Sequence, residues 1–251
     1  STQMDYSHAH LETIAATRPL RYFEQIASTN GLALEWIHEG TEAGSVVLTN
    51  EQFSGRGRLG RRWFAPAGTA LLFTYIYSPP NEFAIRSAML GALAVAETCT
   101  MLGVPDIGIK YPNDVQSNGL KLSGILAEAA TSANKISVAL GIGLNVRVDF
   151  STTPFEYTAA SLEQLLNRPL DRLGLLSALL DRLDYWRDRI ASDLLFESWK
   201  DYLNMLGKPV EINTGGGSVS GIAQDVLPSG ALILERTDGK QQQVMAGHSI
   251  L

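Results

Sequence analysis

The dipeptide Asn118-Gly119 constrains the fold more than any other short stretch of this chain, because it lies between two runs that contain apolar residues. Asn-Gly in such a place predicts a two-residue β-hairpin. The expected register pairs Ser117 with Leu120, Gln116 with Lys121, Val115 with Leu122 and Asp114 with Ser123. Because opposed residues share a face and alternate positions return to it, Asp114 and Lys121 are expected to project from the same side.

A further strand is predicted from the alternation in KISVALGIGLNVRV, residues 135–148. Every second residue from Ile136 to Val146 is a branched apolar residue and falls on one face. The other face carries Ser137, Ala139, Gly141, Gly143 and Asn145. Glycines within a strand commonly mark a place where a ligand or another backbone comes close. Asn145 is therefore expected on a face with little side-chain bulk.

The rest of the chain predicts an α+β fold with a mixed sheet flanked by helices. Strands are expected near residues 23–27, 45–52 and 69–78, and helices after Thr29, over 82–103 and over most of 161–203 with a break near 167–169. From Lys208 onward, four or five short β runs separated by glycine-rich turns predict a small barrel. We expect one domain over residues 1–205, of which 1–18 are loosely ordered, and a second over 206–251.

Composition limits the classes of protein to which the chain can belong. The formal net charge of -6 argues against a surface built to coat nucleic acid or an anionic membrane. No secretory signal and no uncharged apolar run of membrane-spanning length is present, and the single cysteine fits a reduced, cytoplasmic compartment. We expect Cys99 to be a buried packing residue in a helix. The histidines are scattered along the chain and are expected to form no metal centre: His8, His10, His38 and His248.

The segment SGRGRLGRRW, residues 54–63, places four arginines and three glycines in ten positions. Arginine donates paired hydrogen bonds to phosphate or carboxylate, and glycine lets backbone N–H groups approach an anion. The segment lacks the Gly-Lys-Ser/Thr of a P-loop and the dinucleotide fingerprint. Two other interpretations stay open: a solvated, mobile loop, or a segment that contacts RNA, against which the acidic composition counts.

Five motifs occur in order: STN at 28–30, GRGRLGRRW at 55–63, KYPNDV at 110–115, KLSGILAE at 121–128 and GIGLNV at 141–146. As a set they resemble the biotin protein ligases, over roughly residues 20–251. The resemblance implies a catalytic domain similar to class II aminoacyl-tRNA synthetases and a C-terminal SH3-like barrel. It also implies two steps: ATP activates biotin as biotinoyl-5'-AMP with release of pyrophosphate, and a lysine of a biotin carboxyl carrier protein then takes the biotin and releases AMP.

The resemblance also assigns roles to individual residues. Those implied to bind biotin are Ser28, Thr29, Asn30, Gln52, Gly55, Arg56, Gly57, Arg58 and Lys121. Those implied to bind ATP or the adenylate are Arg58, Trp63, Lys110, Asn113, Gly124 and Asn145. Those implied to be catalytic are Lys121, Arg56, Arg58 and Asp114, with Asp114 serving either Mg²⁺ or the acceptor amine. Simpler structural roles compete with these: a helix cap for residues 28–30, a turn for 112–114, and ordinary packing for Trp63.

The resemblance leaves three further expectations. About 27 residues precede Ser28, too few for the DNA-binding domain of bifunctional ligases, so we expect a ligase without repressor function and no DNA partner. Family members often form homodimers, so a dimer is a possible partner state. Two other functions compete with biotin ligation: a lipoate-type ligase, and a non-catalytic module that binds RNA through the arginine-glycine loop.

Overall fold

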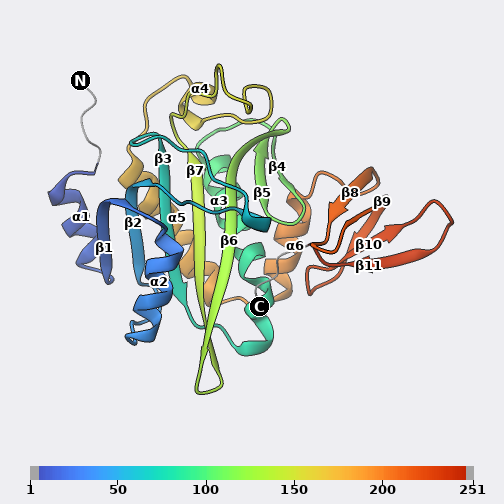
Figure 1. Cartoon of the computed structure of the whole chain (residues 1–251), viewed down its shortest axis with the longest axis horizontal. Coiled ribbons are helices and arrows are strands. Elements are labelled where there is room, and N and C mark those ends of the chain that lie inside the picture. The colour runs from blue at the N-terminus through green and yellow to red at the C-terminus, as the bar shows by residue number, and fades with distance from the viewer. Residues whose placement is uncertain (1–5, 247–251) are drawn as a thin grey trace.

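The computed structural model describes residues 6–246 and contains a seven-stranded mixed sheet (Figure 1). Its strands lie in the order β1-β2-β3-β7-β6-β5-β4. Only β1 and β2 run parallel among these neighbours, and the other pairs are antiparallel. The strand bounds are β1 Leu20–Ile26, β2 Val46–Gln52, β3 Ala70–Tyr77, β4 Ile107–Lys110, β5 Asp114–Ser117, β6 Leu120–Ser132 and β7 Lys135–Asn145. The predicted α+β class and mixed sheet are confirmed.

The hairpin predicted at Asn118-Gly119 joins β5 to β6, but only part of its register is as expected. Both turn residues have positive φ, and Ser117 pairs with Leu120 and Gln116 with Lys121. The next pair is Val115 with Ser123, so β6 contains one extra residue at this point. The predicted Val115–Leu122 and Asp114–Ser123 pairs are therefore wrong, because a β-bulge interrupts the ladder.

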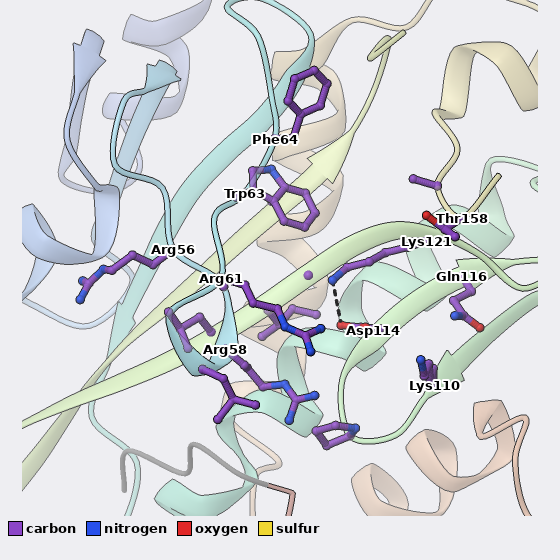
Figure 2. A pocket seen from close by; sticks show the side chains of 18 of the residues that line it. Arg56, Arg58, Arg61, Trp63, Phe64, Lys110, Asp114, Gln116, Lys121 and Thr158 are labelled. Atoms are coloured by element: carbon purple, nitrogen blue, oxygen red, sulfur yellow. Dashed lines mark ion pairs between the residues drawn. The ribbon is translucent and has the colours of Figure 1, made fainter. Parts of the chain in front are cut away.

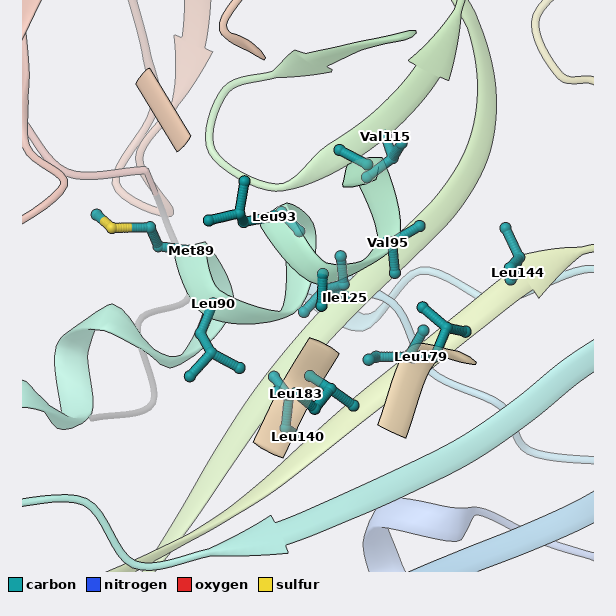
Figure 3. Close-up of a cluster of buried hydrophobic side chains, with 14 of the residues drawn as sticks. Met89, Leu90, Leu93, Val95, Val115, Ile125, Leu140, Leu144, Leu179 and Leu183 are labelled. Carbon is teal, nitrogen blue, oxygen red and sulfur yellow. The ribbon is translucent and has the colours of Figure 1, made fainter. Parts of the chain in front are cut away.

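Helices cover both faces of the sheet, and the larger core lies on one of them. α3 Ser87–Met101, preceded by the 3-10 turn η2 Asn81–Arg86, packs there with α5 Arg172–Arg187 and α6 Asp193–Tyr202. Figure 3 shows leucines of α3 and α5 meeting Leu140 of β7. On the opposite face, α2 Thr29–His38 packs Ala33 and Trp36 on β2, β3 and β7. This second face is the one with the glycines of β7.

The N-terminal segment differs from the expectation of loose order over residues 1–18. Residues 1–5 lie outside the described part of the chain, but α1 spans His8–Ala15. Ser7 caps it, since its side chain accepts from the His10 N–H, and Ile14 is buried. An apolar contact with the core thus orders a segment whose composition alone predicted little structure.

The α3 segment is apolar enough to require comment. Residues Asn81–Met101 meet the length and composition of a membrane-spanning helix, but 72% of that window is buried inside the protein. Core packing accounts for this apolar character. Cys99 lies within the helix, fully buried as predicted, and burial raises the pKa of its thiol to about 12. A thiol kept protonated in this way is a poor nucleophile.

The region from 161 to 203 is helical, with two breaks where one was predicted. α4 Leu162–Leu166 ends at Asn167, which adopts the left-handed conformation, close to the expected interruption. A second break, between Arg187 and Asp193, separates α5 from α6. Ser192 caps α6 by accepting from the Leu195 N–H, and that local bond explains the new start.

The C-terminal region forms a separate four-stranded antiparallel sheet in the order β11-β10-β9-β8 (Figure 1). Its strands are β8 Pro209–Asn213, β9 Ser218–Val226, β10 Leu232–Glu235 and β11 Gln241–Val244. Two side chains of the large domain hold its β9–β10 turn: the Tyr111 hydroxyl donates to the Gly230 carbonyl at 2.7 Å, and Arg86 Nε donates to the Pro228 carbonyl at 3.1 Å. The domain boundary predicted near residue 205 stays a prediction.

Candidate active site

One cavity of about 1020 Å³ brings together residues from all five sequence motifs. It opens on the sheet face that carries α2, and Arg58 and Lys121 both line it. Figure 2 shows Lys121 and Asp114 joined at the cavity, with Trp63 and Arg58 on either side of them. Predicted site residues that line it are Ser28, Thr29, Asn30, Gln52, Arg56, Gly57, Arg58, Trp63, Lys110, Asp114, Lys121, Gly124 and Asn145.

The first motif, residues 28–30, forms the start of α2. It caps the helix and also lines the cavity. Ser28 is the N-cap, and its hydroxyl oxygen accepts from the Gly31 N–H at 3.3 Å. The Thr29 N–H donates to Gln52 Oε1 at 2.8 Å, which joins the helix start to the end of β2. The backbone N–H of Thr29 therefore fixes which end of the Gln52 amide is oxygen.

Asn30 was predicted to bind biotin, but it is buried and makes hydrogen bonds within the protein. Its Nδ2 donates to the Leu126 carbonyl and to Glu128 Oε1, both at 3.1 Å. A Cβ at Gly141 would lie 2.5 Å from Asn30 Oδ1. Gly141 is a glycine because the Asn30 side chain approaches the strand there, and not because a ligand or another backbone does.

Trp63 lies flat against the other glycines of this face. A Cβ at Gly143 would lie 2.8 Å from the indole, and one at Gly124 would lie 2.9 Å from it. The indole Nε1 is buried and has no hydrogen-bond partner within residues 6–246. Contact with Gly124 and Gly143 fixes the plane of the indole ring. Trp63 therefore forms a wall of the cavity directly beside Lys121, whose Nζ lies 5.4 Å from the ring centroid.

The arginine-glycine loop is folded back on itself as a closed turn. Arg56 and Arg62 form an isolated antiparallel bridge around the 3-10 turn η1 Arg58–Gly60. Leu59 holds φ at 60°, a conformation that costs a leucine energy. Arg56 reaches from this loop to Glu128 on β6, with 3.1 Å between Nη2 and Oε1. One ion pair thus joins the loop to the sheet beside Asn30.

Arg58 is the half-buried arginine of the loop, whereas Arg56, Arg61 and Arg62 are exposed. Burial lowers the pKa of the Arg58 guanidinium below its ordinary value, and the Asp114 carboxylate opposes that shift. A guanidinium that has lost solvent gains more from an anion than one in water does. Arg61 and Arg62 line the same cavity, so all four loop arginines surround one space.

Lys121 and Asp114 form an ion pair across β5 and β6, with 3.4 Å between Nζ and Oδ1. The expectation that they share a side is confirmed. The Lys121 side chain is 38% exposed and that of Asp114 is 22% exposed, so solvent and ligands reach both. A cation and a carboxylate on rigid strands can compensate charge and move a proton at the same place.

Two predicted ligand-binding residues lie outside the cavity lining. Asn113 is buried, and its Nδ2 donates to the Ile125 carbonyl at 2.8 Å. Gly55 is buried under Gln52, whose Nε2 would lie 3.0 Å from a Cβ at Gly55. These two residues support the site from behind. Asn145 does line it, and its Nδ2 holds the Lys121 and Ala160 carbonyls at 3.2 Å each.

Several lining residues were not predicted from the sequence. Phe64 meets Phe150 and Phe155 at ring-centroid distances of 6.1 and 6.0 Å, and Tyr157 beside them is 84% exposed. Clustered exposed aromatic side chains are common at binding surfaces. The aromatic residues in DFSTTPFEYT, residues 149–158, were a signal for it in a segment otherwise typical of a loop. Glu211 and other residues of β8 also reach the cavity.

The acidic residues of this cavity do not form a resident metal centre. Across residues 6–246, no group of three or more histidine, cysteine or acidic side chains could hold an ion. Asp114 and Glu211 are the carboxylates among the lining residues, and they come from different domains.

Comparison with known proteins agrees with this geometry. The family model described as "Biotin/lipoate A/B protein ligase family" matches residues 22–145, and that of the "Biotin protein ligase C terminal domain" matches 205–248. The biotin--[acetyl-CoA-carboxylase] ligase of Paracoccus denitrificans is 33% identical over 85% of this chain and 93% of its own. That of Mycobacterium tuberculosis is 33% identical over 92% and 88%.

A solved structure is similar over almost the whole chain. The biotin protein ligase from Aquifex aeolicus in complex with biotin and ATP matches with a TM-score of 0.76 and 26% identity, covering 91% of this chain and 96% of that one. The similarity therefore extends over both the large sheet and the C-terminal sheet. The chain belongs to the biotin/lipoate A/B protein ligase family and carries the C-terminal domain of the biotin protein ligases.

Proposed function

We propose that this chain is an ATP-dependent biotin protein ligase, which makes biotinoyl-5'-AMP and transfers the biotin to a lysine of a carrier protein. The observation that carries the proposal is that the arginine loop and Lys121 line one cavity together with the neutral polar residues at the start of α2. The cationic residues suit the carboxylate and phosphate groups of the substrates, and the neutral polar residues suit the uncharged ring of biotin. The names of the relatives and the biotin and ATP of the Aquifex aeolicus complex support the same activity.

The neutral wall is suited to the ureido ring of biotin. Ser28 Oγ accepts the Gly31 N–H, which leaves the Ser28 hydroxyl proton for a ligand carbonyl. Thr29 and Gln52 present oxygens beside it, which suit the ring N–H groups. An uncharged bicyclic ring gains specificity from such neutral donors and acceptors. Asn30 orients this wall from behind, and its own polar atoms are already used within the protein.

In the first step, a carboxylate oxygen of biotin attacks the α-phosphorus of ATP, and the bond to the β-bridging oxygen breaks as pyrophosphate leaves. Negative charge gathers on the α-phosphate oxygens. Lys121 and Arg58 are the cations assigned to this charge, because both line the cavity and neither needs to leave its strand or loop to face it. Fixed charges stabilise such a transition state without reorganisation.

Aromatic residues and the loop complete the adenylate site. Phe64, Phe155 and Tyr157 offer an exposed surface for the adenine ring, and Trp63 separates this surface from the glycine face. Lys110 and Asn145 line the same cavity and are assigned to the nucleotide. The arginine-glycine loop is assigned to close over the bound ligands and exclude water from a mixed anhydride that would otherwise hydrolyse.

In the second step, the amine of the acceptor lysine attacks the biotinoyl carbonyl, an amide bond forms, and AMP leaves with the electron pair of the broken C–O bond. The attacking amine must lose a proton. Asp114 is assigned to receive it, because its carboxylate lies in the cavity beside Lys121 on a rigid strand. Mg²⁺ is assigned to the phosphates of ATP as part of that substrate.

The partner proposed for the second step is a biotin carboxyl carrier domain, in keeping with the relatives' names. Because β8 of the C-terminal sheet lines the cavity, the acceptor lysine is expected to enter between the two domains. The cytoplasm is the proposed location, and the net charge of -6 supports the absence of a DNA partner. A homodimer is a further proposal, which sedimentation of the purified chain tests.

The function is tested by ATP–pyrophosphate exchange run with biotin and, separately, with lipoate. Lipoate is the second candidate because the matching family model includes lipoate ligases. Exchange that depends on biotin, together with labelling of a carrier domain, supports the proposal. Exchange with lipoate alone would assign the chain to the lipoate branch. A folded protein that exchanges with neither acid would contradict both assignments.

A further inference from the structure

Four polar side chains, three in the neutral wall and one behind it, form a hydrogen-bond chain whose hydroxyl protons can be counted. It runs from Asn30 through Thr74 of β3 and Thr29 to Gln52. Thr74 Oγ1 lies 2.6 Å from Asn30 Oδ1 and 2.7 Å from Thr29 Oγ1. Thr29 Oγ1 lies 3.2 Å from Gln52 Oε1. Each of these three contacts joins two oxygen atoms, so each needs a proton to be attractive.

The amide groups at both ends of this chain have a fixed orientation. Asn30 uses one N–H for the Leu126 carbonyl and the other for Glu128, so its Oδ1 must face Thr74. Glu128 also accepts from Arg56 Nη2. At the other end, the Thr29 N–H donates to Gln52 Oε1, so the amide oxygen must face Thr29. Neither amide can turn to supply a proton.

The two threonine hydroxyls therefore bring two protons to three oxygen–oxygen contacts. One contact has no donor of its own, however the two protons are arranged. Repulsion between two bare oxygens is strongest at short range, so the contacts of 2.6 and 2.7 Å take the protons. The remaining contact is Thr29–Gln52 at 3.2 Å, and both of its residues line the cavity.

We propose that Thr74, which lines no part of the cavity, makes this wall specific for a ligand that brings an N–H group to the Thr29–Gln52 pair. The inference rests on the proposed function, in which that group is a ureido N–H of biotin. While Thr74 engages the Thr29 hydroxyl, Thr29 Oγ1 and Gln52 Oε1 offer only lone pairs to the ligand. A ring oxygen at the same place meets two acceptors and is rejected.

Glu128 is the second residue that positions this hydrogen-bond chain. Its carboxylate can only accept, and it holds one Asn30 N–H and the Arg56 guanidinium at the same oxygen, Oε1. The side chain is 11% exposed. Glu128 thereby reinforces the direction that the Leu126 carbonyl already imposes on Asn30, and it joins the hydrogen-bond chain to the arginine-glycine loop. Neither Thr74 nor Glu128 needs to touch the reacting atoms for this role.

The experiment compares binding of biotin with binding of cyclic carbamate analogues, in which a ring oxygen replaces one or the other ureido N–H. The unmodified chain should prefer biotin over the analogue altered at the contacted position by about tenfold or more. In Thr74→Val the Thr29 hydroxyl is released and can donate to a ring oxygen. The preference should then fall several-fold, while the rate of pyrophosphate exchange at saturating biotin changes by less than about twofold.

Two variants separate this effect from a general loss of structure. Thr74→Ser keeps a hydroxyl proton at the same place and should restore the preference. Thr98→Val removes an equally buried hydroxyl, which donates to the Ala94 carbonyl within α3, and should keep the preference intact. If Thr74→Val folds too poorly, Thr74→Ala provides the second measurement. It also removes the Thr74 hydroxyl, so the Thr29 hydroxyl is again released and the preference should fall.

The outcomes distinguish this inference from the function on which it rests. A preference that is unchanged in both Thr74→Val and Thr74→Ala overturns the inference while leaving biotin binding in place. An unmodified chain that binds the carbamates as well as biotin overturns it too. An unmodified chain that binds no biotin overturns the proposed function together with the inference.

Discussion

Lys121 Nζ lies 3.4 Å from Asp114 Oδ1, and a β-bulge is what directs both side chains to the glycine face of the sheet. Lys121 and Gly124 are three residues apart, so strict alternation would place them on opposite faces. The extra residue in β6, between the pairs Gln116–Lys121 and Val115–Ser123, reverses the alternation at this point. Bulges often redirect side chains in this way beside active sites.

The first prediction concerns the cation on this bulge. Replacing Lys121 with methionine keeps the apolar stem beside Trp63 and removes the charge. The rate of biotin-dependent ATP–pyrophosphate exchange should fall about 10²- to 10³-fold, since a fixed cation at the reacting phosphate is lost. Lys135→Met, at the exposed start of β7, is the matched control and should retain activity. Equal rates for the two variants would remove Lys121 from the mechanism.

The second prediction separates the two roles that the sequence left open for Asp114. Asp114→Asn should slow transfer of biotin from preformed adenylate to the carrier by about 10²-fold, because the amide cannot accept the proton of the attacking amine. Pyrophosphate exchange should slow much less. Single-turnover transfer and exchange are measured side by side. A loss in exchange that high Mg²⁺ concentration restores would instead assign Asp114 to the metal.

The sequence was sufficient to predict most of the strands, the position of the turn at Asn118-Gly119 and, apart from Gly55 and Asn113, a set of polar and charged residues that line one cavity. These features depend on local patterns: alternation gives strands, and Asn-Gly fits two positive φ angles. Lys121 and Asp114 were correctly expected on one side. The bulge could not be predicted, because one extra residue in a ladder depends on how β6 pairs with two neighbours at once.

The limits of the sequence are clearest at the glycines of β7. Gly141 and Gly143 were correctly assigned to one uncluttered face, but what approaches them is Asn30 and Trp63, which are far away in the chain. No local pattern reports such contacts. The same holds for Asn113, where a polar residue in a sequence motif is buried and bonds the Ile125 carbonyl. Tertiary packing decides which members of a motif support a site and which face a ligand.

The third prediction tests the contact between Trp63 and Gly143. An added methyl in Gly143→Ala would lie 2.8 Å from the indole, closer than real Cβ contacts allow, so the ring must move. The Kd for biotinoyl-5'-AMP should rise about tenfold or more, because the wall of the site is displaced. Gly216→Ala is the control, since the nearest atom to its Cβ is 4.0 Å away. Binding is measured by quenching of tryptophan fluorescence and checked by calorimetry.

The fourth prediction concerns pH and stability at a site far from the chemistry. Asp184 accepts hydrogen bonds from Arg18 and Tyr75, each at 2.7 Å. Burial alone would raise the pKa of this carboxyl, but the bonds from Arg18 and Tyr75 outweigh burial and lower it. A lowered pKa gives stability that is present above the unfolded value of about 3.9 and is lost as pH falls through the folded value.

Asp184→Asn should therefore cost about 1–2 kcal/mol of unfolding free energy at pH 7, a modest figure because the side chain is 32% exposed. The difference from the unmodified chain should shrink as pH falls below about 4. Urea unfolding at several pH values measures it. A difference that stays constant down to pH 2 would show that packing, and not the charge of Asp184, is responsible.

The last prediction concerns closure of the arginine-glycine loop. Trypsin cleaves after arginine, so Arg58, Arg61 and Arg62 report how open the loop is. Biotin with ATP should slow cleavage there at least several-fold, because the ligand's negative charge draws the guanidinium groups inward and orders the loop. In Glu128→Gln the ion pair to Arg56 is lost, and cleavage without ligand should be faster. Cleavage at Arg236 in the C-terminal sheet, far along the chain, should be unchanged and serves as the internal control. Equal rates in Glu128→Gln and the unmodified chain would show that the 3.1 Å pair does not hold the loop, because an anchor that matters must alter the fraction of time the loop is open.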